Sequence, residues 1–442
     1  MEMRVHPTTV IAWIATAALV VGCSTQPPEA GEQAVDRTEP MLSTGGTAGV
    51  VSSAHPLATR AGIEILADGG NAFDAAVAVA AMLNVVEPNM SGIGGYGTLL
   101  VYHAETGENR FLNASGRIPR GVDSDAYRAP TPDYQANRRG AKAVSTPGNA
   151  NVWQAMLESY GVADRQAVFA AAIRTAEEGF EVSPRLAFFL SGAFGEFSAE
   201  AQAIYGHDGK PLAAGERLVQ EDLGATLRRL ATDGAEVIHG GEIGRAIDQA
   251  MRSAGGFLTL ADLAENEAEW YEPIRIDYRG YEVVTASPPA TAFPSLVRLG
   301  LMSRFDTAEL GHNSVEYLHR FAEVTKHAFW SRLAHAGDPE LFPPPLEKLL
   351  SEAYWAEQAA AIDLRQASRF EPPGSRVRDP GHASSSHTTH FVVADRWGNI
   401  VSATQTLGNS FGSRILVPGT GIWLNNSLAY CTFEPKGNPM DA

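Results

Sequence analysis

Two adjacent threonines, Thr388 and Thr389, stand where a Ser-rich loop meets a strand-like stretch, and His390 follows them. A threonine hydroxyl is a poor nucleophile unless a base lies beside it. If the chain were cut between His387 and Thr388, the new α-amine of Thr388 could be that base, because its pKa of about 7.7–8.0 leaves it poised near neutral pH. Paired threonines are also ordinary in strands, so a plain strand is the simpler interpretation of these residues alone.

A serine nucleophile is one alternative, because residues 408–412 fit the pattern GxSxG with Ser410 at its centre. That motif needs a strand before the serine, a helix after it and a histidine further along the chain. A strand is expected before Ser410, but residues 413–419 have no helical pattern, and no histidine follows His390. The sequence therefore disfavours a serine hydrolase.

Two other patterns suggest a cofactor or a metal ion, and both lack the required context. Residues 92–97 fit GxGxxG, but the dinucleotide motif follows a strand and opens a helix, whereas here the expected order is helix then strand. His319, Glu323 and His327 fall on one face of an expected helix. The HExxH arrangement is absent there, and an amphipathic helix explains the three residues. We therefore expect no cofactor and no metal ion.

The composition is typical of a soluble globular protein, with 442 residues of which 44% are hydrophobic and 19% charged. Lys and Arg total 34 against 51 Asp and Glu, which gives a formal net charge of −17. This charge argues against a nucleic-acid partner, because phosphates demand a basic surface. It is compatible with a small-molecule substrate.

The N-terminus has the features of a bacterial lipoprotein signal over residues 1–23. An apolar run at residues 10–21 follows Arg4; it is too short to span a bilayer and has the length of a signal peptide. Residues 20–23, Val-Val-Gly-Cys, resemble a lipobox, which implies acylation of Cys23. A plain secretory signal with a bystander cysteine is the alternative. Residues 24–46 indicate a flexible tether, so we expect a periplasmic or cell-surface protein anchored at Cys23, with the outer membrane as its expected site.

Hydrophobic periodicity predicts the elements that would position the two threonines. Asn71 is expected to cap a buried helix over 72–86, with Asp74 in its first turn. Strands over 390–394 and 400–406 would form a hairpin. Further helices are expected over 57–67, through much of 152–253 and over 314–336, and further strands over 98–103, 110–114, 274–278 and 281–285.

Together with the threonines, several segments resemble the gamma-glutamyltransferase family. Segments similar to the start of its small subunit are residues 388–390, 411–413 and 421–426, and segments similar to its large subunit are residues 69–78, 86–88, 91–95, 176–180 and 255–263. The resemblance runs from about residue 47 to the last residue, Ala442. It implies an α/β fold, the four-layer αββα sandwich of N-terminal-nucleophile hydrolases, without a metal or cofactor.

The resemblance also implies how the chain is divided and which residues react. Residues 47–387 would be the large subunit and residues 388–442 the start of the small subunit, with both parts staying associated after self-cleavage. Thr388 would be the nucleophile, and Thr406 would support it with its hydroxyl. Since the stretch from Thr388 to Ala442 is much shorter than the family's small subunit, we expect a C-terminally truncated chain that is inactive alone.

The positions that would bind the substrate depart from the family. In the family, an arginine binds the substrate's α-carboxylate, and polar and acidic residues bind the substrate's α-amino group. At the position of that arginine this sequence has Ser115, with Arg117 nearby. A serine cannot replace the two parallel hydrogen bonds that an arginine guanidinium donates to a carboxylate. We therefore expect poor use of gamma-glutamyl substrates. We also expect the chain to belong to the branch of the family that includes cephalosporin-acylase-like members. The candidate substrate-binding residues are Ser115, Arg117, Gly408, Asn426, Ser427 and Tyr430.

The predicted function is an amide hydrolase or acyl transferase that processes itself and passes its acyl group to water or an amine. A catalytically inactive binding or scaffold relative in the periplasm is the alternative from another class.

Overall fold

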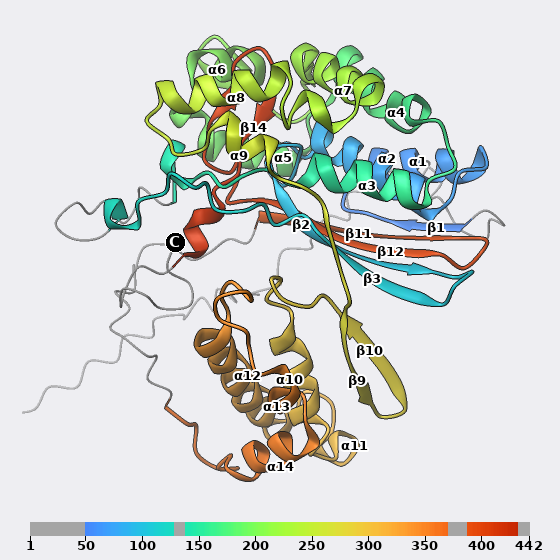
Figure 1. Cartoon of the computed structure of the whole chain (residues 1–442), viewed down its shortest axis with the longest axis vertical. Helices are drawn as coiled ribbons and strands as arrows, with labels where there is room; N and C mark the ends of the chain where they lie inside the picture. The colour runs from blue at the N-terminus through green and yellow to red at the C-terminus, as the bar shows by residue number, and fades with distance from the viewer. Residues whose placement is uncertain (1–48, 128–137, 370–386, 432–442) are drawn as a thin grey trace, which may run out of the picture. The chain divides into compact units, whose positions relative to one another are not determined.

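The computed structural model describes residues 49–127, 138–369 and 387–431 (Figure 1). The predicted signal segment with Cys23, the predicted tether over 24–46 and the residues leading to His387 lie outside these ranges. The described residues all belong to one compact unit. In the described part of the chain, every helix falls short of the length or the hydrophobicity that crossing a membrane requires.

A six-stranded antiparallel sheet carries both threonines of interest. Its strand order is β1-β11-β12-β2-β3-β8. The hairpin β11–β12 therefore lies inside the sheet, between strands that come from the first part of the chain (Figure 1). The strands are β1 (Gly49–Ser52), β2 (Tyr96–His103), β3 (Glu108–Asn113), β8 (Glu269–Tyr271), β11 (His387–Asp395) and β12 (Ile400–Gly408).

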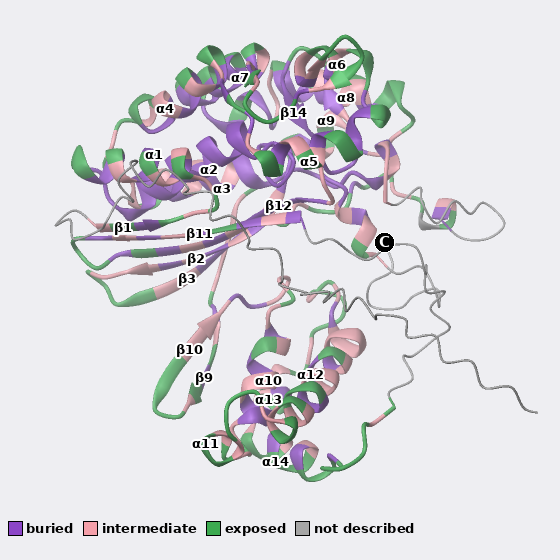
Figure 2. Cartoon of the chain, turned by 180° about the vertical axis from the view of Figure 1, so that it is seen from behind, coloured by how far each residue is buried: buried purple, intermediate pink, exposed green. Residues whose placement is uncertain are grey.

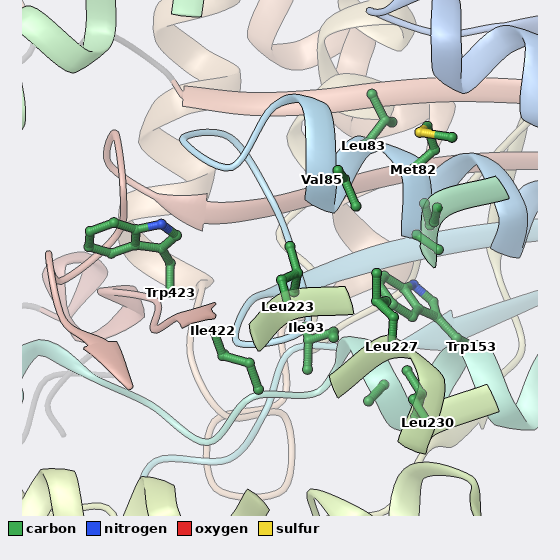
Figure 3. Packing of buried hydrophobic residues seen from close by; sticks show 14 of the residues in the cluster. Met82, Leu83, Val85, Ile93, Trp153, Leu223, Leu227, Leu230, Ile422 and Trp423 are labelled. Atoms are coloured by element: carbon green, nitrogen blue, oxygen red, sulfur yellow. The ribbon is translucent and has the colours of Figure 1, made fainter. Parts of the chain in front are cut away.

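Helices cover one face of this sheet. The fully buried α2 (Ala72–Val86) contacts β11 and β12, and α1 (Pro56–Ala67) packs beside it. Figure 3 shows how side chains from this layer, among them Met82, Trp153 and Leu227, form one hydrophobic core. The other helices that contribute to this core region are α3 (Asn149–Tyr160), α4 (Arg165–Glu178), α5 (Pro184–Ala193), α6 (Ala199–Tyr205), α7 (Glu221–Asp233), α8 (Glu242–Ser253) and α9 (Leu260–Ala264).

Burial alternates along the central strands, as expected when one face of a sheet is covered (Figure 2). On β11, Phe391 and Val393 are buried in the core, while Thr388 and His390 belong to the opposite, less buried face. On β2, Leu99 is buried and Tyr96 lies on the face of Thr388. The period of two thus decides which side chains share a face with the predicted nucleophile.

A second hydrophobic core gathers side chains such as Phe293, Val324 and Trp355. It contains α10 (Phe293–Met302), α12 (Val315–His335), α13 (Leu346–Leu349), α14 (Glu352–Ala360) and the hairpin of β9 (Ile274–Tyr278) with β10 (Tyr281–Thr285). The remaining short elements are α11 (Thr307–Leu310), β4 (Phe180–Glu181), β5 (Gly206–His207), β6 (Lys210–Pro211), β7 (Arg217–Leu218), β13 (Leu416–Val417), β14 (Ile422–Trp423) and five 3₁₀ turns at Ser124–Tyr127, Ala141–Ala143, Phe194–Glu196, Ala235–Val237 and Ser427–Tyr430.

The predicted mixed α/β fold is confirmed, and the helix over 72–86 begins and ends where the sequence placed it. Asn71 caps it: its side-chain oxygen accepts from the N–H of Phe73 at 2.9 Å, while Asp74 accepts from the N–H of Asn71 at 2.9 Å. β11 begins at His387, three residues before the predicted strand start at His390, because Thr388 and Thr389 already pair with β12.

Candidate active site

The pairing of β11 with β12 changes register at the predicted cleavage bond. Thr388 lies opposite Thr406 while His387 lies opposite Gly408, so Leu407 is an extra residue on β12. Such a bulge bends the strand and re-aims its side chains. Gly408 has φ +97°, a conformation that favours glycine, and a Cβ there would lie 2.1 Å from Oδ1 of Asn426. The bulge therefore depends on a glycine at this position.

The Thr406 hydroxyl joins both sides of the His387–Thr388 peptide bond. The hydroxyl of Thr388 donates to Thr406 Oγ1 at 3.1 Å, and the hydroxyl of Thr406 donates to the carbonyl oxygen of His387 at 2.7 Å. The N–H of Gly408 also donates to Thr406 Oγ1, at 2.8 Å. The two accepted bonds leave the Thr406 proton directed at His387, where it polarises the carbonyl that Thr388 would attack.

The residues on either side of Thr388 point to the opposite face and are held by the helical layer. The hydroxyl of Thr389 donates to Oε2 of Glu87, just after α2, at 3.3 Å. The ring of Phe189 on α5 meets the ring of His387 edge-on, with centroids 5.0 Å apart. Both flanks of the predicted cleavage bond are therefore anchored, which restricts the conformations open to the bond between them.

Burial shifts the pKa values of two of these residues, Glu87 and His387. It raises the pKa of Glu87, a shift that Arg185 and the hydrogen bond from Thr389 oppose. It lowers the pKa of His387, and the positive charge of Arg185 lowers it further. His387 is therefore neutral at neutral pH.

The glycine-rich loop at residues 92–97 serves close packing. It lies between α2 and β2, the helix–loop–strand order expected from the sequence. A Cβ on Gly95 would lie 2.4 Å from the carbonyl oxygen of Thr406, and one on Gly97 would lie 2.4 Å from that of Thr404. Glycine at these positions lets the loop and β2 approach the strand that carries Thr406.

Asn426 braces the bulge. Its Nδ2 donates to the carbonyl oxygen of Arg138 at 2.7 Å, and its Oδ1 accepts from the N–H of Asn409 at 2.8 Å. Its backbone N–H donates to the carbonyl oxygen of Leu407 at 2.9 Å. These contacts engage both ends of the Asn426 side chain, and its role in binding substrate stays a prediction.

Ser115 and Arg117 follow the end of β3, which β2 and β12 separate from β11. Three strand spacings place β3 roughly 14 Å from β11. Arg117 pairs with Glu269 at 2.7 Å, so its guanidinium already has a carboxylate partner. Among the other predicted binding residues, Gly408 positions Thr406, whereas Ser427 and Tyr430 lie in the 3₁₀ turn that follows Asn426.

Sequence reasoning missed Tyr96, which lies directly opposite Thr406 on β2. Its hydroxyl is 3.4 Å from the position of a Cβ on Gly408, and its ring meets that of Tyr430 edge-on at 6.5 Å. Burial, together with the neighbouring phenol of Tyr430, raises the pKa of Tyr96 well above its ordinary value, so the phenol is neutral. Strand periodicity could have placed Tyr96 on a face, but not beside Thr406.

The competing sites have structural explanations. Ser410 is followed by a turn and then the short strand β13, so the helix of a nucleophile elbow is missing there. On α12, Glu323 accepts from Lys326 at 2.6 Å, and Nε2 of His319 bonds the carbonyl oxygen of Asp363 at 2.8 Å. In the described ranges, no group of three or more His, Cys, Asp or Glu residues is arranged to hold a metal ion.

Comparison with known proteins decides the family. The profile described as Gamma-glutamyltranspeptidase matches residues 58–441. The chain belongs to this family. It is 36% identical over 401 residues to the Acylase ACY 1 proenzyme of Pseudomonas sp. strain SE83, covering 88% of this chain and 70% of the relative. It is 32% identical over 409 residues to the Glutathione hydrolase proenzyme of Bacillus subtilis strain 168, covering 89% and 70%.

The fold agrees with this family. Cephalosporin acylase from Bacillus halodurans superposes with a TM-score of 0.79 at 32% identity, covering 88% of this chain and 71% of that structure. The predicted family and N-terminal-nucleophile fold are therefore confirmed. As a gamma-glutamyltranspeptidase family member, the protein is an enzyme of the amide hydrolase and acyl transferase type.

Proposed function

We propose that the protein cuts itself between His387 and Thr388 and then uses Thr388 as the nucleophile for amide hydrolysis or acyl transfer. One observation carries the proposal: the hydroxyl of Thr406 accepts a hydrogen bond from the Thr388 hydroxyl and donates one to the carbonyl oxygen of His387. The predicted nucleophile and the bond it would attack thus share one hydrogen-bonding partner.

In the self-cleavage step, Oγ1 of Thr388 attacks the carbonyl carbon of His387. Negative charge develops on the carbonyl oxygen, and the hydroxyl of Thr406 donates to that oxygen. The C–N bond then breaks, the nitrogen of Thr388 takes the hydroxyl proton, and an ester joins His387 to the Thr388 side chain. Water hydrolyses the ester and leaves a carboxylate on His387 and a free α-amine on Thr388.

After the cut, the α-amine of Thr388 is the base nearest to its own hydroxyl. It takes the hydroxyl proton as Oγ1 attacks the amide carbonyl of a substrate, and the protonated amine then supplies a proton to the leaving amine. The acyl group stays on Thr388 as an ester until water or an acceptor amine removes it. Thr406 continues to orient the Thr388 hydroxyl.

We propose that the two parts stay associated after the cut, and that an acyl chain on Cys23 anchors the large subunit in the bacterial envelope. Strand pairing supports the association: β11 pairs with β1, and β12 pairs with β2, so strands after the cut lie between strands before it. The anchor rests on the sequence of residues 20–23.

Intact-mass measurement of the complete gene product, expressed from the whole parent gene as wild type, Thr388→Ala and Thr388→Ser, tests the self-cleavage. We expect wild type to give two fragments, one ending at His387 and one beginning at Thr388. Thr388→Ser keeps a hydroxyl and should still cleave, whereas Thr388→Ala should remain whole. Cleavage at this bond in Thr388→Ala, or an uncut wild type without amidase activity, would reject the proposal; the second result would favour the inactive scaffold.

A further inference from the structure

Three side chains form a row across neighbouring strands on the face that carries the proposed nucleophile. Thr388 on β11 lies opposite Thr406 on β12, which lies opposite Tyr96 on β2. Side chains directly opposite one another in a sheet project from the same face. Two strand spacings place the backbone of Tyr96 roughly 10 Å from that of Thr388.

An acyl group on Thr388 that follows this row must reach Tyr96. Its carbonyl carbon lies about 3–3.5 Å from Oγ1 at the point of attack, so a substituent of a few bonds spans the remaining distance. Thr406 is only 7% exposed, and its hydroxyl is occupied by its bonds to Thr388, His387 and Gly408. The next side chain along the row is therefore that of Tyr96, which is partly buried and whose hydroxyl oxygen is buried.

Tyr430 extends this surface. Its ring meets that of Tyr96 at an interplanar angle of 79°, and the residue Tyr430 is 52% exposed. Near the Tyr96 hydroxyl, Gly408 contributes no side chain, and Oδ1 of Asn426 lies beside the position that a Cβ on Gly408 would take. These neighbours of the Tyr96 phenol, and Ser427, which also contacts it, are uncharged. A charged group placed against them would lose its hydration without gaining an opposite charge.

We infer that Tyr96, extended by Tyr430, is a specificity-determining residue that selects acyl groups ending in a neutral apolar or aromatic side chain. The inference rests on the proposed role of Thr388. An aromatic acyl group gains ring contacts with both tyrosines. A zwitterionic gamma-glutamyl group meets uncharged phenols and is disfavoured.

Hydrolysis of phenylacetyl-p-nitroanilide and gamma-glutamyl-p-nitroanilide by the complete gene product tests this, with the ratio of the two kcat/KM values as the readout. We expect wild type to favour the phenylacetyl amide by about tenfold or more, in the range that apolar pockets provide. Tyr96→Ala should lower this ratio about tenfold, and Tyr96→Phe, which retains the ring, should restore it. Tyr96→Leu, which removes the aromatic ring but keeps an apolar side chain, replaces Tyr96→Ala if the alanine variant fails to fold.

Tyr102→Ala is the matched control, because Tyr102 lies on the same face of the same strand and pairs with Ile400 at the far end of β12. Its ratio should equal that of wild type. A wild type that favours the gamma-glutamyl amide, or a ratio that Tyr96→Ala and Tyr96→Leu leave unchanged, overturns the inference and leaves the proposed function standing. A wild type that cleaves neither amide and does not cut itself overturns both.

Discussion

Replacing Thr406 with valine removes one hydroxyl while retaining the shape of the side chain. Three hydrogen bonds disappear: the one donated to the carbonyl oxygen of His387 at 2.7 Å, the one accepted from Thr388 at 3.1 Å and the one accepted from the N–H of Gly408 at 2.8 Å. Loss of a single donor to a developing oxyanion costs about 10²–10³ in rate. We therefore expect Thr406→Val to slow self-cleavage by about 10²–10³.

The same substitution destabilises the fold, because it leaves buried partners of Thr406 unsatisfied at about 1–3 kcal/mol each. The two effects must be separated. Self-cleavage is followed by intact mass over time after synthesis, and stability is followed by the thermal midpoint of the uncut chain. Thr406→Ser, which returns the hydroxyl, should restore most of the rate.

Thr404→Val is the control for the loss of a hydroxyl on the same strand and face. The Thr404 hydroxyl bonds Nδ1 of His390 at 2.8 Å, and the His390–Thr404 pair lies two residue pairs along from the Thr388–Thr406 pair. It should cleave at nearly the wild-type rate. If Thr406→Val cleaves within about threefold of wild type, well short of the loss expected for an oxyanion donor, then the Thr406 hydroxyl does not stabilise the reaction and the argument from geometry is wrong.

Three further predictions use other parts of the chain. Gly408→Ala should lower both the thermal midpoint and the self-cleavage rate, because φ +97° strains an alanine and its Cβ would meet Oδ1 of Asn426. Equal self-cleavage rates in wild type and Gly408→Ala would show that the bulge is not needed for self-cleavage. Burial lowers the pKa of His239 to about 4, so between its ordinary value and about 4 the unfolded chain binds more protons, and this residue's contribution to stability falls with falling pH by up to about 1.4 kcal/mol per unit. Urea unfolding should show a shallower acid slope for His239→Asn than for wild type, and identical slopes would contradict this. In a bacterial host, Cys23→Ala should move the protein from the membrane to the soluble fraction, and an unchanged partition would exclude the lipid anchor.

Local signals in the sequence predicted the helices well. Asn71 and Asp74 form a capping box within four residues, and the apolar composition of 72–86 already indicated a buried helix. The same holds for β9 and β10, whose turn at Arg279 and Gly280 lies between two strand-like runs. In each case the residues that decide the structure are neighbours along the chain.

The details of the site could not be predicted, because they depend on contacts between distant residues. The bulge at Leu407 is held by the carbonyl oxygen of Met90, which accepts from its N–H, and by Asn426. Tyr96 comes beside Thr406 only through the pairing of β2 with β12, two strands far apart in the sequence. The pairing of Arg117 with Glu269, 152 residues away, leaves no periodic signal in the sequence.

The position of β11 inside the sheet has a consequence for how the enzyme would lose its structure. Before the cut, β1 and β11 belong to one polypeptide, and refolding after denaturation is a unimolecular event. After the proposed cut, the same strand pairs would join two polypeptides, so unfolding would release them and recovery would depend on their concentration. The mature enzyme would then stay folded mainly because its unfolding is slow. After denaturation, a sample refolded at low protein concentration should regain less activity than one refolded at high protein concentration.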